Sequence, residues 1–102
     1  MHTGNDDLLL LRALCQANDG GICRRACDIL WNYPWADGEH RVIFEACARL
    51  LQLNARISPN LLASHLTRKG FPDVDLDALF EPLPLAAAEL ARRLDALEGQ
   101  SR

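Results

Sequence analysis

The stretch that decides the fold is residues 40–51, His40-Arg41-Val42-Ile43-Phe44-Glu45-Ala46-Cys47-Ala48-Arg49-Leu50-Leu51. Its most regularly spaced apolar residues are Ile43, Ala46, Cys47, Leu50 and Leu51. They recur every three or four positions, which is the spacing of one broad face of an α-helix. Such a densely apolar face must be covered by several neighbouring elements. We therefore expect this segment to be the central helix, packed against most of the others.

Two shorter helices are expected before this stretch. Residues 7–17 have apolar side chains at helical spacing, with Arg12 and Gln16 on the face expected to meet water. Turn formers at residues 18–21 end this helix. A second helix then follows over about residues 22–31.

An aromatic connector, Trp31-Asn32-Tyr33-Pro34-Trp35, leads to the central helix. It holds half of the aromatic residues of the chain, and Pro34 favours an extended conformation at Tyr33. Asp37 is expected to cap the central helix, because a carboxylate accepts hydrogen bonds from the free amides of a first helical turn.

The clearest start signal in the chain lies after the central helix. Ser58 is expected to be an N-cap and Pro59 to occupy the first helical position, while Ile57 and Leu62 can close a hydrophobic staple. Gly70 is expected to end this helix in the left-handed conformation.

Two further helices are expected near the C-terminus. A short one runs through residues 76–80, capped by Asp73 or Asp75, and the last one ends at Gly99. The apolar residues of the last segment are Leu83, Ala87, Leu90, Leu94 and Leu97. Their alternating spacing of four and three gives a narrow stripe that faces one partner helix, and Glu89 supports Arg93 at i,i+4.

Composition agrees with these helices. The chain has 102 residues, of which 49% are apolar and 6% aromatic, and a formal charge of -3. We predict a compact all-α bundle of five to six helices, forming one domain over 1–102 with an ordered core of about 7–98. Without a secretory start or an apolar run of about 18 residues, a cytoplasmic protein with no membrane contact is expected.

Catalytic motifs are not evident. Gly20-Gly21 lacks the Gly-Lys-Ser/Thr arrangement of a phosphate loop. His40 and His65 have no cysteine and orienting group nearby in sequence, and the acidic residues at positions 73–81 fit a solvated helix face. We therefore expect no enzyme, no cofactor and no small-molecule substrate.

The four cysteines allow an alternative. Cys23 and Cys27 are one helical turn apart, so with Cys15, Cys47 or His40 they could supply soft ligands to zinc. Their spacing matches no paired zinc motif, and each lies on an apolar stripe, which favours reduced core residues and no bound metal. A small metal- or redox-linked cysteine protein stays open as an alternative.

A helix-turn-helix is a second alternative, because residues 58–69, a tight turn and another helix have its outline. The second helix would carry Asp73, Asp75, Asp77 and Glu81, which repel phosphates. Direct contact with nucleic acid is therefore not expected.

The His40-Arg41-Val42-Ile43-Phe44-Glu45-Ala46 segment resembles the N-terminal domain of DnaB-type replicative helicases, where a histidine and an Ile-Phe-Glu-Ala run open a central helix. The resemblance covers about residues 8–97. It implies an all-helical, non-catalytic module through which helicase subunits associate and which contacts primase or a loader. No ATPase domain or Walker lysine follows, so an excised domain and a stand-alone relative are both open.

The leading hypothesis is a protein-interaction or self-association module. The leucine stripe of the last segment, if the bundle leaves it uncovered, is one expected contact; the other outcome is that it seals the core. Exposed tryptophans of the connector are another expected contact, unless they plug the seam between two helices. The expected partner-binding residues are Leu83, Leu90, Arg93, Leu94, Leu97, Trp31 and Trp35.

Overall fold

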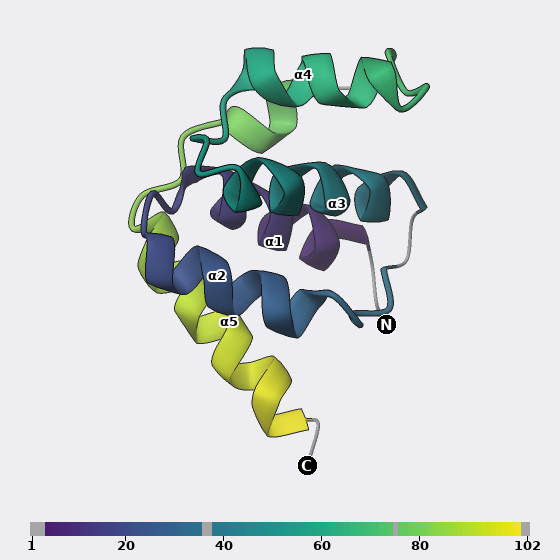
Figure 1. The fold of residues 1–102 in the computed structure, drawn as a ribbon. Helices are drawn as coiled ribbons and strands as arrows, with labels where there is room; N and C mark the ends of the chain where they lie inside the picture. Colours follow the sequence, from purple (N-terminus) through teal and green to yellow (C-terminus); the bar gives the residue numbers. More distant parts are fainter. Residues whose placement is uncertain (1–3, 36–37, 75, 101–102) are drawn as a thin grey trace.

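The described residues form five α-helices and one short 3₁₀ helix. The computed structural model describes residues 4–35, 38–74 and 76–100, and no strand occurs in these ranges (Figure 1). The elements are α1 (Gly4–Gln16), α2 (Gly20–Leu30), α3 (Gly38–Gln52), α4 (Pro59–Arg68), η1 (Asp77–Phe80) and α5 (Ala86–Gln100). The predicted all-α bundle is confirmed.

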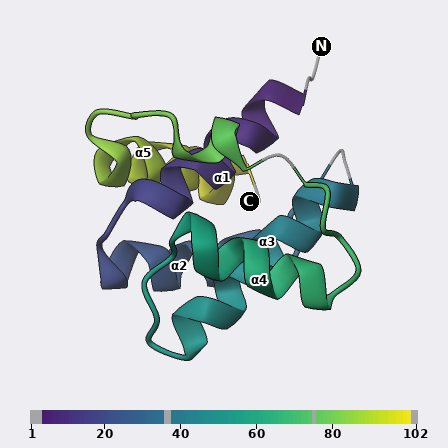
Figure 2. The ribbon, with the colours of Figure 1, turned by 90° about the horizontal axis from the view of Figure 1, so that it is seen from above.

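Two helices share the centre of the bundle. α1 packs against α3, η1 and α5, and α3 packs against α1, α4 and, more lightly, α2. Figure 2 shows α4 alongside α3 and α5 alongside α1. The helix that was expected to be central, α3, therefore packs against only some of the other elements, because α5 and η1 pack against α1 instead.

Leucine is the most frequent residue in the core that these packed faces form. Leu11 and Leu14 of α1, Phe44 of α3, and Leu90 and Leu94 of α5 are at most 2% exposed. Full burial of such a side chain stabilises the folded state by about 1.5–3 kcal/mol relative to exposure. No helix among the described residues combines the length and the apolar character that a bilayer crossing requires.

The start of α4 follows the predicted signal. Ser58 Oγ accepts a hydrogen bond from the Leu61 amide at 3.2 Å, and Pro59 is the first helical residue. Ile57 and Leu62, the predicted staple, are both buried. Gly70 has φ +91°, the left-handed conformation predicted for the end of this helix.

Ser58→Ala is expected to destabilise the chain by about 1 kcal/mol, because the Leu61 amide loses its acceptor. Urea unfolding followed by circular dichroism measures this cost. Ser64→Ala, at an exposed position within α4, is the matched control and should change stability by less than about 0.5 kcal/mol. Equal costs at both positions would contradict the cap.

Several predicted boundaries are corrected. α2 begins two residues early, at Gly20, because Asp19 caps it by accepting a hydrogen bond from the Ile22 amide at 3.1 Å. The short helix is a 3₁₀ turn whose N-cap position is Leu76, with no side-chain cap bond, so Asp73 does not cap it. The other expected caps, Asp37 and Asp75, lie outside the described residues.

The last helix also differs from the prediction. It starts at Ala86, after Leu85, whose φ of +56° breaks any continuation from Leu83. It continues through Gly99, which therefore does not end it. A glycine weakens a helix interior but does not by itself forbid it.

Arg12 and Gln16 do not simply face water. Gln16 Nε2 donates to the carbonyls of Leu79 and Glu81 at 3.1 and 2.6 Å, and its Oε1 accepts from the Leu83 amide at 3.0 Å. Arg12 donates to the carbonyls of Glu81 and Pro82. These two side chains hold the segment between η1 and α5 against α1.

Gln16→Ala should therefore cost about 2 kcal/mol, because three hydrogen bonds are lost together. Gln52→Ala is the matched control, since Gln52 is exposed and, among the described residues, accepts only one long bond, from Arg49 at 3.5 Å. Denaturant midpoints of the two variants provide the comparison, and similar midpoints would rule out a clamp at Gln16.

Candidate functional site

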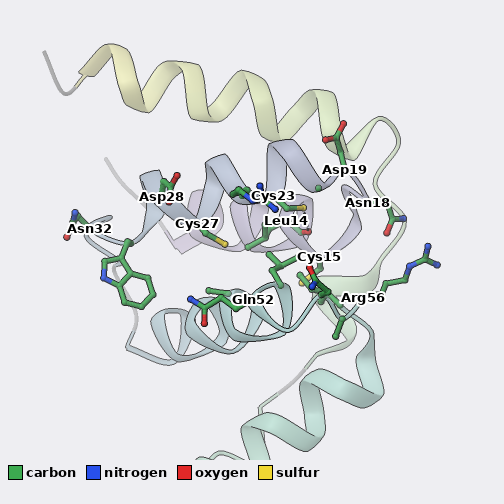
Figure 3. Close-up of a pocket in the computed structure, with 18 residues that line it drawn as sticks. Leu14, Cys15, Asn18, Asp19, Cys23, Cys27, Asp28, Asn32, Gln52 and Arg56 are labelled. Carbon is green, nitrogen blue, oxygen red and sulfur yellow. Dashed lines mark hydrogen bonds between the residues drawn. The ribbon is translucent and has the colours of Figure 1, made fainter.

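A groove lies between α2 and α3. Its cavity has a volume of about 810 Å³, within the range of about 300–1,000 Å³ typical of ligand pockets. The groove exists because α2 packs mainly against α5 and only lightly against α3. Figure 3 shows Asp28 and Asn32 toward one end of the groove and Asn18 and Arg56 toward the other.

The floor of the groove is apolar and rich in thiols. α1 contributes Leu14 and Cys15, α2 contributes Cys23 and Cys27, and α3 contributes Leu51. Cys15 and Cys23 are buried, whereas Cys27 is half-buried. Burial raises the pKa of Cys27 to about 11, so at neutral pH its thiol is protonated and behaves as a small apolar group.

Charged side chains without partners lie around the floor. Arg24, Asp28 and Arg56 all line the groove and are exposed. Within the described part of the chain, none of the three has an ion-pair or hydrogen-bond partner. Arg25, by contrast, binds Asp95 and Glu98 of α5. The charges at the groove are thus available to a ligand.

Trp31 is one of the residues that line the groove. Its side chain is 52% exposed, and its ring meets Phe44 edge to face with the ring centroids 6.2 Å apart. Trp35 is only partly exposed, and its ring lies 5.5 Å from Phe44 and 4.7 Å from Tyr33. Of the two predicted tryptophans, Trp31 is therefore the one presented at the groove.

The predicted leucine stripe lies elsewhere, and it is covered. Leu90 and Leu94 are 0% exposed in the core, because α5 packs across α1 and α2. Leu83 and Leu97 are partly buried against the same core, and neither lines the groove. The expectation of an uncovered stripe is corrected accordingly. In Figure 3, α5 lies on the side of α2 away from the groove.

Arg93, the charged residue of the predicted set, is held within α5. Its Nε donates to Glu89 at 2.7 Å, which confirms the predicted i,i+4 pair. This hydrogen bond is the main reason that the pKa of Glu89 is lowered. Of the seven predicted contact residues, the groove therefore includes Trp31 alone.

Within the described residues, the geometry gives no support to a metal site or to a helix-turn-helix. Among the described residues, no three His, Cys, Asp or Glu side chains are placed to hold a metal ion. The four cysteines are free, and three of them are buried in the core, as predicted. The second helix of a helix-turn-helix is here a single 3₁₀ turn of four residues, Asp77–Phe80.

A polar cluster that the sequence did not indicate joins α1 to α3. Asp7 is 2% exposed, and its Oδ1 accepts a hydrogen bond from the Tyr33 hydroxyl at 3.0 Å. His40 Nδ1 lies 3.8 Å from Asp7 Oδ2. Because Asp7 is 26 positions from Tyr33 and 33 positions from His40, no local pattern could have indicated the cluster. Its position between packed elements fits the structural role expected for His40.

The fold and the groove define a small all-helical domain with an open, apolar-floored site. Comparisons of the chain with protein-family models, curated proteins and solved structures find no match. The resemblance to DnaB-type helicase N-terminal domains therefore stays a prediction.

Proposed function

We propose that the chain is a non-catalytic protein-interaction module whose groove between α2 and α3 binds an amphipathic helix of a partner protein. The observation that carries this proposal is the half-exposed Trp31 beside an apolar floor with unpaired charges around it. The helicase resemblance suggests the setting, in which the partner is a helicase subunit, primase or a loader.

The shape of the groove favours a helix as the ligand. Two neighbouring helices that diverge leave a channel into which the apolar face of a third helix fits, with anchors at i, i+3, i+4 and i+7. The floor residues Leu14, Cys27 and Leu51 would meet this apolar face. Exposed tryptophan at such a site is typical of binding hot spots.

The charges favour one kind of helix and one direction. Arg56 and Arg24 would pair with carboxylates of the partner, whereas Asp28 near Trp31 disfavours them at that end. A bound helix would also place its negative C-terminal pole toward Arg56 and its positive N-terminal pole toward Asp28. The proposed ligand is thus an apolar-striped helix with acidic residues toward its C-terminus.

A displayed peptide library tests this proposal. The probe is a set of peptides of about 18 residues, or five helical turns, with a fixed apolar stripe and randomised polar positions. Selection on the wild-type chain should enrich acidic residues toward the peptide C-terminus. Trp31→Ala should weaken the selected peptides about 30-fold, which corresponds to a hot spot of about 2 kcal/mol.

Leu53→Ala is the matched control, because Leu53 is 61% exposed and does not line the groove. It should leave peptide affinity within about twofold, a change of about 0.4 kcal/mol. Arg56→Glu should reverse the charge preference of the selected peptides. Peptides that bind Trp31→Ala and wild type equally, or a selection that enriches nothing, would count against the groove as the binding site.

A further inference from the structure

Two thiols meet beneath the floor of the groove. Cys15 of α1 and Cys47 of α3 are 32 positions apart in sequence, and their Sγ atoms lie 3.8 Å apart. A disulfide requires about 2.05 Å, so the two sulfur atoms need to approach by about 1.8 Å. Both atoms are ends of short side chains on helices that already pack together.

The surroundings of the two thiols give them different roles. Cys15 is 6% exposed and lines the groove, so a small molecule in the groove can reach it, whereas Cys47 is 0% exposed. The hydrogen bond with Cys15, followed by burial, raises the pKa of Cys47. Cys47 is therefore a protonated thiol next to a more accessible sulfur.

The other two cysteines have raised pKa values. Burial raises the pKa of Cys23 and raises that of Cys27 to about 11. Since the thiolate is the reactive form, both react slowly at neutral pH.

We infer that Cys15 and Cys47 form a peroxide-sensitive redox switch, in which a disulfide fastens α1 to α3 beneath the groove. Cys15 loses its proton and its sulfur attacks one oxygen of hydrogen peroxide; the O–O bond breaks, hydroxide is released, and a sulfenic acid is left on Cys15. The released hydroxide takes up the proton that Cys15 lost and leaves as water.

Cys47 then completes the reaction. It loses its proton and attacks the Cys15 sulfur, the S–O bond breaks, and the hydroxyl group leaves with that proton as a second water. Two electrons pass from the two thiols to the peroxide. The switch does not depend on what the groove binds, because its chemistry needs only this pair and the oxidant.

Peptide mapping of the oxidised wild-type chain tests the switch. The reduced protein is treated with hydrogen peroxide, the remaining thiols are alkylated, and the digest is analysed by mass spectrometry. We expect a linked Cys15–Cys47 peptide pair that has lost two hydrogens, with Cys23 and Cys27 alkylated. The melting temperature should rise by about 10 °C or more, because the link constrains the unfolded chain across 32 positions, and dithiothreitol should reverse the rise.

Two variants separate the switch from general oxidation. Cys27→Ser keeps the pair and should show the same link and the same rise in melting temperature. Cys47→Ser removes the resolving thiol, so Cys15 should proceed to sulfinic acid with no rise. If Cys47→Ser does not fold, peptide mapping of the wild-type chain still shows whether Cys15 and Cys47 become linked. A link through Cys23 or Cys27, a link between two chains, no link, or a link without a rise in melting temperature would each overturn the inference.

Discussion

Leu94→Asp is expected to unfold the chain under conditions in which the wild type is folded. Leu94 is 0% exposed where α5 crosses α1 and α2. The substitution removes a buried apolar side chain and places an uncompensated charge in the core. The free energy of unfolding should therefore fall by several kcal/mol. A domain of this size has a total stability of only about 5–15 kcal/mol. Circular dichroism and a one-dimensional NMR spectrum would detect the loss.

Leu85→Asp is the matched control, because Leu85 is 81% exposed just before α5. Its φ of +56° is a conformation that aspartate tolerates better than leucine, and a carboxylate is favourable near a helix N-terminus. We expect this variant to be at least as stable as the wild type. If the Leu94→Asp chain instead folds normally and changes only its oligomeric state, the leucine stripe is a contact between chains and not part of the core.

Phe44→Ala is expected to destabilise the chain by about 3–5 kcal/mol, since Phe44 is 2% exposed. Its ring contacts both Trp31 and Trp35, so the connector loses its support on α3 as well. Tryptophan emission should shift to longer wavelength at temperatures where the variant is still folded. Urea unfolding provides the free-energy difference.

Phe71→Ala makes the same chemical change at a side chain that is 39% exposed. It should cost about 1 kcal/mol or less, because little apolar area is lost from a packed core. A similar cost for Phe44→Ala and Phe71→Ala would be incompatible with the packing of Trp31 and Trp35 on the Phe44 ring.

The helices themselves could be predicted because their signals are local. The apolar spacing of residues 40–51, the Ser58 cap and the left-handed Gly70 each depend on a few neighbouring residues. Helix boundaries were less predictable where two signals compete. Asp19 starts α2 inside an expected turn, and Gly99 is carried within α5.

Long-range contacts could not be predicted in the same way. Arg12 and Gln16 reach backbone groups 63 to 70 positions away, and Asp7 reaches Tyr33 across 26. Hydropathy places such polar residues on the solvent side, because their partners become neighbours only after the chain has folded. The burial of Leu90 and Leu94 could not be predicted for the same reason, because the spacing of a leucine stripe does not indicate which surface covers it.

The groove combines one residue that the sequence indicated with others that it did not. Trp31 was indicated by its place in the aromatic connector. Arg24 and Arg56 gave no signal, because arginines on a helix or loop are ordinary surface residues. Cys27 lay on a stripe expected to be buried, yet it is half-buried because α2 packs on α5 rather than fully on α3.

The most direct test of the central claim is to map the contact of a selected helical peptide on the isotope-labelled chain by NMR. We expect amide shifts to change at Cys23, Cys27, Trp31, Leu51 and Arg56, which line the groove, and the shifts of α4 and α5 to stay unchanged. Changes centred on α5, with the residues of the groove unmoved, would contradict the claim.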